Sequence, residues 1–426
     1  MAWRFLHFAD LHMGIEDHGY IDPGTGLHTR VQDFVDSLGF VCDQAIQERV
    51  DLVIFAGDAY KNCTPSPTHQ REFALQVRRL QQADLPLVMV VGNHDAPGAF
   101  GKATSMDIFT ALELDNTYVI RRPALLRIDT HNGPIQIAGL PWPTRHLLRT
   151  HDEYKDLPQE AINQKIQEIC TLQIEEFARQ LDPALPAILT AHIAAAEATY
   201  SGSERTAIIG QDPTMLTSTL ANPAFDYVAL GHVHKHQDLH SQASPPVVYA
   251  GSLERINFGE ERDEKGFCLV DIEEQPDAED SRTHRKSTYE FISTPARPFV
   301  TIQLEVLEGE DPTELIVDAI DESDIKDAVV RVLYALPVAD ANSTVDLERV
   351  HQALVPAFCV AGIQPQTAPI NRLRRAAITE DLGLGEALDR YIENNPALQD
   401  QRDILHRYAR DLEQEIELLN RGEETT

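Results

Sequence analysis

Five short groups of polar residues carry side chains that commonly bind metal ions. Each group directly follows an apolar run typical of a buried strand. The groups are Asp10-Leu11-His12, Gly57-Asp58, Gly92-Asn93-His94-Asp95, His192 and Gly231-His232-Val233-His234. In an open α/β sheet the ends of the strands share one edge, and ligands bind at that edge. We therefore expect these groups to converge on one site, although they are far apart in the sequence.

The residue types indicate which ions would bind there. The candidate ligands are Asp10, His12, Asp58, Asn93, His192, His232 and His234. Oxygen and nitrogen donors without a thiolate suit Mn²⁺, Fe or Zn²⁺, and so many histidines make Mg²⁺ less natural. Seven side chains are too many for one ion, but a bridging Asp58 would serve two ions about 3.5 to 4 Å apart. Such a pair is typical of phosphoester hydrolysis by a metal-activated water.

The first 275 residues alternate apolar runs with amphipathic segments, which predicts an α/β fold of layered sheets flanked by helices. The predicted strands are 3–9, 51–56, 86–91, 135–140, 186–190, 227–230 and 247–250. The clearest predicted helices are 31–48 and 68–82, and the polar segment 273–286 is interpreted as a long hairpin loop.

The pattern restarts after Pro295, which predicts three parts: residues 1–295, a small α/β domain at 296–370 and a helical segment at 371–426. The small domain should contain strands 299–306 and 328–336 and helices 312–321 and 345–355. The last segment carries two helices with apolar stripes. They either pack on their own domain or bind a helix of a partner protein.

The net charge of −32 weighs against a nucleic-acid partner. Residues 296–426 contain 12 basic and 26 acidic side chains, which leaves 24 basic and 42 acidic for residues 1–295, so neither part is basic. Any contact with DNA must rely on local basic residues, bound metal ions and a partner chain. The five scattered cysteines predict free, buried thiols. The absence of a long apolar run or an N-terminal leader pattern favours a cytoplasmic protein without membrane contact.

The five groups together resemble the signature of the calcineurin-like metallophosphoesterase superfamily. Within it, the chain resembles the SbcD-type nuclease subunits of DNA double-strand-break repair complexes. Further matching segments are Ala9–Gly14, Pro65–Pro67, Ala229–His234, Tyr249–Arg255 and Arg297–Val300. The resemblance covers nearly the whole chain and is firmest up to residue 272.

The resemblance implies a distribution of ligands and roles. Asp10, His12 and His234 would hold one ion, Asn93, His192 and His232 the other, and Asp58 both, with two Mn²⁺ as the usual metal. His94 would stabilise charge at the scissile phosphate or protonate the leaving oxygen, and Asp95 would orient its imidazole.

The family further implies exonuclease and endonuclease activity on DNA in the cytoplasm at the nucleoid. Residues 296–370 would form a capping domain, and the C-terminal helices would bind an SMC-like, coiled-coil ABC-type ATPase. A homodimer is also implied. Lys61 departs from the family pattern, which usually has His or Asp there. Lys61 either meets a phosphate or is a solvated loop residue, so the balance of the two activities stays open.

Two other functions fit the metal motifs. One is a phosphatase or a small-molecule or cyclic-nucleotide phosphodiesterase on the same scaffold, although such an enzyme has no evident use for the additional C-terminal residues. The other is a structural scaffold subunit of the ATPase complex in which the phosphoesterase site is incidental. The complete ligand set argues against the scaffold role.

Overall fold

The structure is a computed structural model of the 426-residue chain. It describes residues 2–97, 101–145, 154–155, 157–201, 212–241, 243–275, 285–337 and 344–367, together with 388, 402 and 404–408. Most of the predicted C-terminal helical segment, 371–426, therefore lies outside the described residues.

The first large sheet has the strand order β14-β13-β1-β2-β3-β4. Its strands are β1 (Ala2–Phe8), β2 (Leu52–Phe55), β3 (Leu87–Val90), β4 (Thr117–Ile120), β13 (Gly266–Glu274) and β14 (Arg285–Ser293). The strands β1 to β4 run parallel, while β13 pairs antiparallel with β1 and β14. The central β2 and β3 are buried along their whole length, as expected of strands covered on both faces.

The second large sheet has the order β11-β12-β10-β7-β6-β5. Its strands are β5 (Ala124–Thr130), β6 (Gly133–Leu140), β7 (Ala187–His192), β10 (Tyr227–Gly231), β11 (Gln237–Asp238) and β12 (Val247–Tyr249). The neighbours β6, β7, β10 and β12 are parallel, whereas β5 and β11 are antiparallel edge strands. A separate pair is formed by β8 (Ala194–Ala195) and β9 (Thr214–Met215).

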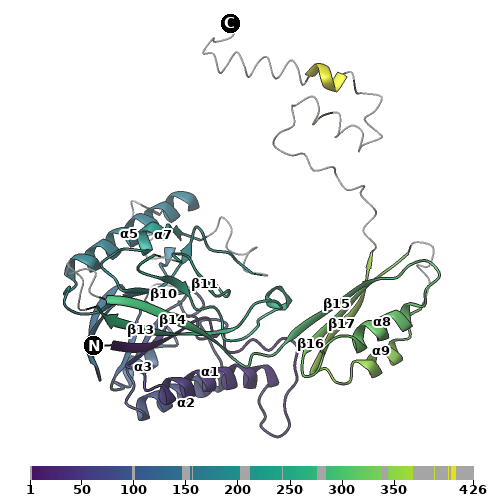
Figure 1. The fold of residues 1–426 in the computed structure, drawn as a ribbon, viewed down its shortest axis with the longest axis horizontal. Coiled ribbons are helices and arrows are strands. Elements are labelled where there is room, and N and C mark those ends of the chain that lie inside the picture. The colour runs from purple at the N-terminus through teal and green to yellow at the C-terminus, as the bar shows by residue number, and fades with distance from the viewer. Residues whose placement is uncertain are drawn as a thin grey trace. The chain divides into compact units, whose positions relative to one another are not determined.

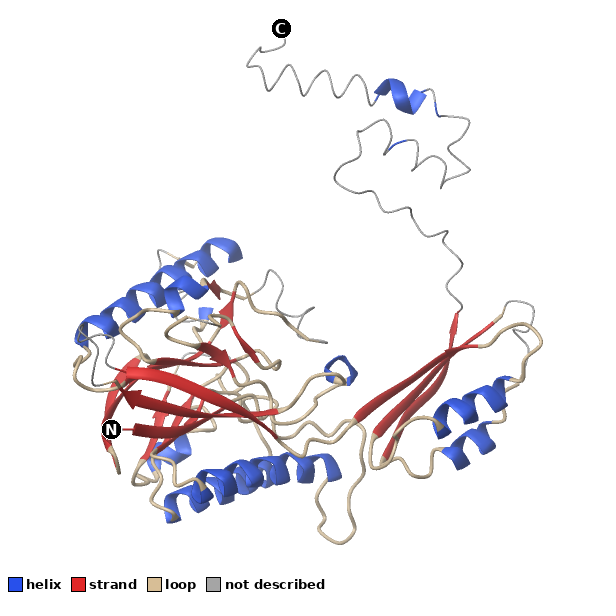
Figure 2. Cartoon of the chain, viewed as in Figure 1, coloured by secondary structure: helices blue, strands red, loops and turns tan. Residues whose placement is uncertain are grey.

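The two sheets pack face to face through one apolar cluster. Phe5 and Ile54 of the first sheet and Ile188 and Ala229 of the second belong to this cluster. Helices cover the outer faces, as Figure 1 and Figure 2 show: α1 (Thr29–Gln47) and α2 (Pro67–Gln82) lie on one side and α5 (Gln159–Gln180) on the other. The layers are therefore helix, sheet, sheet and helix.

Local sequence explains where the two long helices of the first layer begin. The His28 ring accepts a hydrogen bond from the Arg30 amide at the start of α1. Ser66 caps α2 through the amide of His69, and Pro67 occupies the first helical position, where no backbone N–H is needed. The short helices α3 (Asp107–Ala111) and α7 (Thr217–Leu220) and the 3₁₀ helix η1 (Phe258–Glu260) complete this region.

A smaller three-stranded sheet follows, with the order β15-β16-β17. Its strands are β15 (Phe299–Glu305), β16 (Val329–Leu336) and β17 (Cys359–Thr367), and the connections contain α8 (Pro312–Asp321) and α9 (Leu347–Ala353). By compactness the chain divides into two units, the first of which is Met1–Ile302, Ala319–Val332 and Glu348–Ile363. The division into 1–295, 296–370 and 371–426 stays a prediction.

The structure confirms the layered α/β fold and every predicted strand and helix of residues 1–355. It adds the strands β4, β5, β8, β9, β11 and β17 and the helices α3, α5 and α7, none of which was predicted from the sequence. All five cysteines are free, as expected, but the prediction that they are buried is wrong for Cys63 and Cys359, which are only partly buried. None of the described helices is long and apolar enough to cross a membrane.

Candidate metal centre

The predicted ligands meet where strands of both large sheets end. Asp10 and Asp58 follow β1 and β2 of the first sheet, whereas His192 ends β7 and His232 follows β10 of the second. The loops are joined by hydrogen bonds: the Asp10 amide donates to the Gly57 carbonyl at 2.9 Å, and the His232 amide donates to both Asp10 carboxylate oxygens at 3.0 and 3.1 Å. The single open edge expected from the sequence is thus an edge shared by two packed sheets.

One group of donor atoms lies around His12. Its Nε2 is 2.9 Å from Nε2 of His234 and 3.6 Å from Oδ2 of Asp58. Ligand atoms of Asp10, His12 and His234 all lie within 4.8 Å of one another. Three predicted ligands from the ends of β1 and β10 therefore form one compact cluster, which Asp58 adjoins.

A second group lies around Asn93. Its Oδ1 is 2.9 Å from His192 Nε2 and 3.0 Å from His232 Nδ1. Asp58 Oδ2 is 3.3 Å from His192 Nε2, so this carboxylate belongs to both groups. All seven predicted ligands are therefore brought together, with Asp58 between the two groups.

These spacings fit a pair of divalent ions. If two ligand atoms each lie about 2.1 Å from one ion and the angle between them at the ion is a right angle, they are roughly 3.0 Å apart. The spacings of 2.9 and 3.0 Å within the two groups are close to this value. The imidazoles are also oriented by their outer nitrogens. His192 Nδ1 donates to the Ala56 carbonyl at 2.7 Å and His234 Nδ1 to Glu260 Oε1 at 2.9 Å, so each Nε2 faces the cluster.

The buried charges also fit a cationic ligand. Burial raises the pKa of Asp10 to about 6. Burial by itself would lower the pKa of His192, but the carboxylates of Asp58 and Asp10 raise it to about 9. The protonated imidazole thus balances buried negative charge that a metal ion would otherwise balance.

The backbone around the ligands is strained. Asp10, His12, Asp58 and His232 have φ angles of 52°, 50°, 61° and 103°, which non-glycine residues rarely adopt. Each such residue costs on the order of 1–3 kcal/mol, and this strain clusters at functional sites. Close approach explains the glycine at position 92, where a Cβ atom would lie 2.1 Å from Asp58 Oδ1.

His94 is exposed beside the two groups. Its amide donates to Asp58 Oδ1 at 2.8 Å, and its ring stands edge-on to the His12 ring with 4.7 Å between centroids. The expected orientation of the His94 ring by Asp95 is not what the hydrogen bonds show. The ring Nδ1 instead donates to the backbone carbonyl of Lys61 at 2.7 Å. The Lys61 side chain is exposed.

Asp95 is fully buried and connects two loops. Its carboxylate accepts hydrogen bonds from the amides of Asp58 at 2.9 Å, Ala59 at 3.0 Å and Gly92 at 3.1 Å. This arrangement fixes the loop that carries Asp58 against the loop that carries Asn93 and His94. Asp95 therefore acts on the backbone around the ligands, and the described hydrogen bonds of its carboxylate do not include one to the His94 ring.

The sequence analysis missed Glu260 and Lys265, which support His234. Glu260 is buried in η1, and its Oε2 lies 2.7 Å from Nζ of the buried Lys265. Burial alone would raise the pKa of Glu260, but Lys265 and His234 hold it below its usual range. The sequence contains no signal for this pair, because the charged residues around it in the turn are half-buried or exposed and do not differ from it in type.

Trp142 was also missed, although it lies directly against the centre. Its ring is 4.8 Å from the His232 ring, tilted by 32°, and 6.1 Å from the His192 ring. Asp212 was missed too, and its Oδ2 is 3.8 Å from His232 Nε2, a buried atom without a hydrogen-bond partner. Neither residue lies in a motif, so only the fold places them at the site.

A model of the family described as "Calcineurin-like phosphoesterase" matches residues 4–236. The "DNA double-strand break repair protein Mre11" of Haloferax volcanii is 28% identical over 331 residues, which cover 77% of this chain and 60% of that protein. The "Uncharacterized metallophosphoesterase YhaO" of Bacillus subtilis is 26% identical over 271 residues, covering 63% of this chain and 57% of that protein.

The D component of the SbcCD nuclease of Staphylococcus epidermidis is 24% identical over 282 residues, covering 63% of this chain and 66% of that protein. The chain thus spans somewhat less than two thirds of the length of these curated relatives. The family match, in contrast, includes more than half of this chain and every predicted ligand. The protein therefore belongs to the calcineurin-like phosphoesterase family and is a metal-dependent hydrolase.

Proposed function

We propose that this protein is a DNA nuclease that cleaves phosphodiester bonds, internally and from ends, in double-strand-break repair. The observation that carries the proposal is the pair of donor groups sharing Asp58, which suits phosphoester hydrolysis. Two relatives are named as a double-strand-break repair protein and as part of a nuclease, and this supports DNA as the substrate.

In this proposal, Asp10, His12 and His234 would hold one ion, Asn93, His192 and His232 would hold the other, and Asp58 would contribute to both. We propose Mn²⁺ for both, because carboxylate, amide and imidazole donors suit that ion. When bound, the ions supply Lewis-acid stabilisation of phosphoryl oxygens and a water of lowered pKa.

The protein's own groups place a proton donor beside the ions. His94 Nδ1 is occupied by the Lys61 carbonyl, so Nε2 is the nitrogen that can face a substrate. An exposed imidazole at this position can donate a proton to a leaving oxygen or stabilise charge on the phosphate. Asp95 fixes the two loops that determine where His94 and Asp58 stand relative to each other.

The partners and the domain roles are part of the proposal. We assign residues 1–295 to the nuclease domain, 296–370 to a capping domain and 371–426 to docking on an SMC-like coiled-coil ATPase. The names of the nuclease relatives and the apolar stripes in the last segment support this assignment. We further propose a homodimer located in the cytoplasm at the nucleoid, with Lys61 as a phosphate contact.

The test uses the purified full-length chain, with and without the ATPase from the same host. We expect Mn²⁺-dependent cleavage of linear double-stranded DNA, and co-purification of the two proteins through residues 371–426. His94→Ala should lower DNA cleavage by at least a hundredfold while two Mn²⁺ still bind, measured by calorimetry. The matched control is His131→Ala, which removes an exposed histidine outside the site.

Three results would contradict the proposal. Hydrolysis of bis(p-nitrophenyl) phosphate and nucleotides without cleavage of any DNA would indicate the phosphatase or small-molecule phosphodiesterase instead. Loss of metal binding in His94→Ala would show that His94 is a ligand. Full repair activity in cells that carry Asp58→Ala would indicate a scaffold role for the chain.

A further inference from the structure

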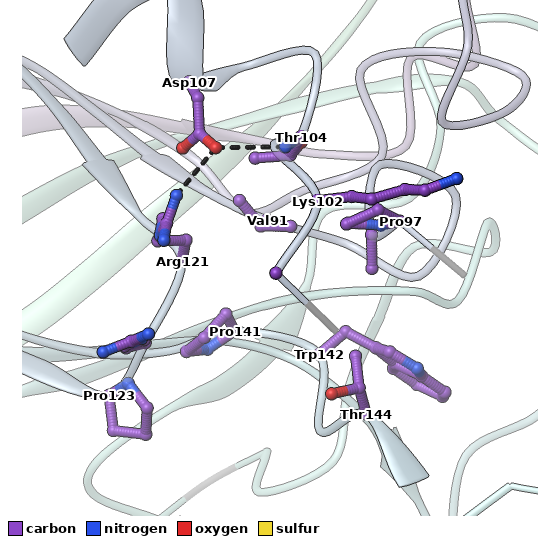
Figure 3. Close-up of a pocket in the computed structure, with 13 residues that line it drawn as sticks. Val91, Pro97, Lys102, Thr104, Asp107, Arg121, Pro123, Pro141, Trp142 and Thr144 are labelled. Atoms are coloured by element: carbon purple, nitrogen blue, oxygen red, sulfur yellow. Dashed lines mark hydrogen bonds and ion pairs between the residues drawn. The ribbon is translucent and has the colours of Figure 1, made fainter. Parts of the chain in front are cut away.

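A hollow of about 530 Å³, whose lining residues Figure 3 shows, lies between the loop after β3, the start of β5 and the loop after β6. Val91 and Trp142 belong to its wall, and the Trp142 amide donates to the Val91 carbonyl at 2.9 Å. Val91 immediately precedes the loop with Asn93 and His94. Trp142 therefore adjoins both the hollow and the rings of His192 and His232.

The charge of this hollow differs from that of the chain. Lys102, Arg121 and Arg122 line it together with a single carboxylate, Asp107, so its formal charge is +2 on a chain of −32. Arg121 is held by Asp107 at 2.8 Å, and the same Asp107 oxygen accepts from the Thr104 amide at 3.0 Å (Figure 3). Among the described residues, Lys102 and Arg122 have no carboxylate partner. Two exposed cations are therefore available to an anionic ligand.

A second hollow of about 360 Å³ continues from the first. It is lined by residues of β4 and the start of β5, and it shares Arg121, Arg122 and Pro123 with the first hollow. The exposed arginines thus stand between two adjoining depressions. The first hollow also includes Trp142, whose ring lies 4.8 Å from that of the proposed ligand His232, so the depressions adjoin the proposed metal centre.

We propose that the two hollows form a path for a single nucleic-acid strand next to the cleaved phosphodiester. We call this path the Trp142–Arg122 groove. A partly exposed indole offers a face for a base, and exposed cations along a groove bind successive phosphates without reading sequence. This inference rests on the proposed nuclease function and adds the surface by which the substrate strand is held.

Binding measurements with a phosphorothioate single-stranded oligonucleotide, Mn²⁺ and increasing salt test the groove. Arg122→Gln should bind more weakly and lower the slope of log K against log salt by about 0.7, the value for one lost phosphate contact on a single strand. Trp142→Ala should weaken binding roughly 5- to 100-fold, as loss of a base–aromatic stack does, and Trp142→Phe should restore most of it.

The matched control is Arg127→Gln, five positions further along β5. Arg127 is equally exposed but lines neither hollow, so this variant should bind with the wild-type affinity and salt slope. Fluorescence anisotropy measures binding. Cleavage of the unmodified oligonucleotide and hydrolysis of bis(p-nitrophenyl) phosphate, measured for wild-type protein, report separately on the DNA activity and on the metal centre.

These readouts separate the two proposals. If wild-type protein cleaves DNA and Arg122→Gln behaves like Arg127→Gln, the groove is wrong and the nuclease stands. If wild-type protein hydrolyses bis(p-nitrophenyl) phosphate but neither binds nor cleaves DNA, the nuclease proposal fails and the groove proposal fails with it. If the groove variants bind the oligonucleotide normally but lose the ATPase, the groove is a protein-docking surface and the strand path is overturned.

Discussion

Replacing Glu260 should weaken metal binding although this residue is not a predicted ligand. The Glu260 carboxylate accepts the Nδ1 proton of His234 at 2.9 Å. In Glu260→Ala that proton loses its acceptor, and the tautomer with the proton on Nε2, the nitrogen 2.9 Å from His12, becomes populated. A protonated Nε2 cannot bind a metal ion. Loss of such an orienting carboxylate typically lowers metal affinity 10- to 100-fold, which is about 1.4 to 2.7 kcal/mol.

The same change should destabilise the metal-free protein by a separate route. Lys265 is only 2% exposed, and Glu260 is its closest carboxylate at 2.7 Å. The uncharged Ser252 hydroxyl at 2.9 Å and His234 carbonyl at 3.2 Å remain after Glu260 is removed, and the one remaining carboxylate within 4.0 Å in the described chain is that of Asp263, at 4.0 Å. Removing one partner of a buried ion pair costs about 3–5 kcal/mol of unfolding free energy.

A double variant separates the two effects. Glu260→Ala with Lys265→Met removes the ammonium that has lost its closest carboxylate and should recover part of the lost unfolding free energy. It leaves the His234 Nδ1 proton without its carboxylate, so metal affinity should stay low. The matched control is Glu264→Ala, which removes an exposed carboxylate from the same turn. It should change neither quantity beyond roughly 0.5 kcal/mol.

Mn²⁺ calorimetry gives the affinity, and urea unfolding in EDTA gives the stability of the metal-free protein. Mn²⁺ binding by Glu260→Ala as tight as that by Glu264→Ala would show that Glu260 does not orient His234 for the metal. Recovery of the affinity together with the stability in the double variant would contradict the same role. In that case the metal would respond to general destabilisation and not to the orientation of His234.

Three further predictions concern other residues. Gly92→Ala should abolish binding of at least one metal ion, seen by metal analysis after dialysis, because its Cβ would lie 2.1 Å from the carboxylate of Asp58. Burial raises the pKa of Glu254 to about 7 from about 4.5, so its protonated form stabilises the fold below pH 4.5 and this stability is lost as pH rises to 7. Between pH 5 and pH 8, the unfolding free energy of Glu254→Gln, measured with urea, should therefore rise relative to that of the wild-type protein by roughly 2–4 kcal/mol. In the native protein only Cys63 and Cys359 should react with a thiol reagent, since the other three cysteines are buried and burial raises their thiol pKa to about 12.

The positions of the predicted ligands were available from the sequence because each directly follows a strand. A strand such as Leu52–Phe55 is apolar along its length, so its end can be located from composition, and Asp58 must then lie at the sheet edge. The edge strand β4 was missed because only Ile120 in it is buried and it carries little apolar pattern. β5 was missed because Asp129 and Arg127 interrupt it.

The supporting residues could not be predicted in the same way. Glu260 reaches His234 because η1 returns the chain to the end of β10, a contact across a turn that no spacing rule contains. Asp95 was expected to bond its neighbour His94 but bonds the amides of Asp58 and Ala59, which are distant in sequence. Local proximity suggested the first contact, and only the packing of the two loops reveals the second.

The acidity of the chain is compatible with the proposed DNA substrate because of where its charges lie. Four buried carboxylates surround the centre: Asp10, Asp58, Asp95 and Glu260. Among the described residues, Lys265 is the one buried lysine. Two divalent ions would add a charge of +4 where the phosphate must sit. The exposed Lys102 and Arg122 would extend this positive region along the Trp142–Arg122 groove. Repulsion of DNA phosphates by the acidic remaining surface is screened beyond about 8–10 Å at physiological salt. The contacts of the phosphates with the metal ions, Lys102 and Arg122 would be direct and would not be screened in this way. Cleavage should therefore depend on metal loading more steeply than on the net charge of the chain.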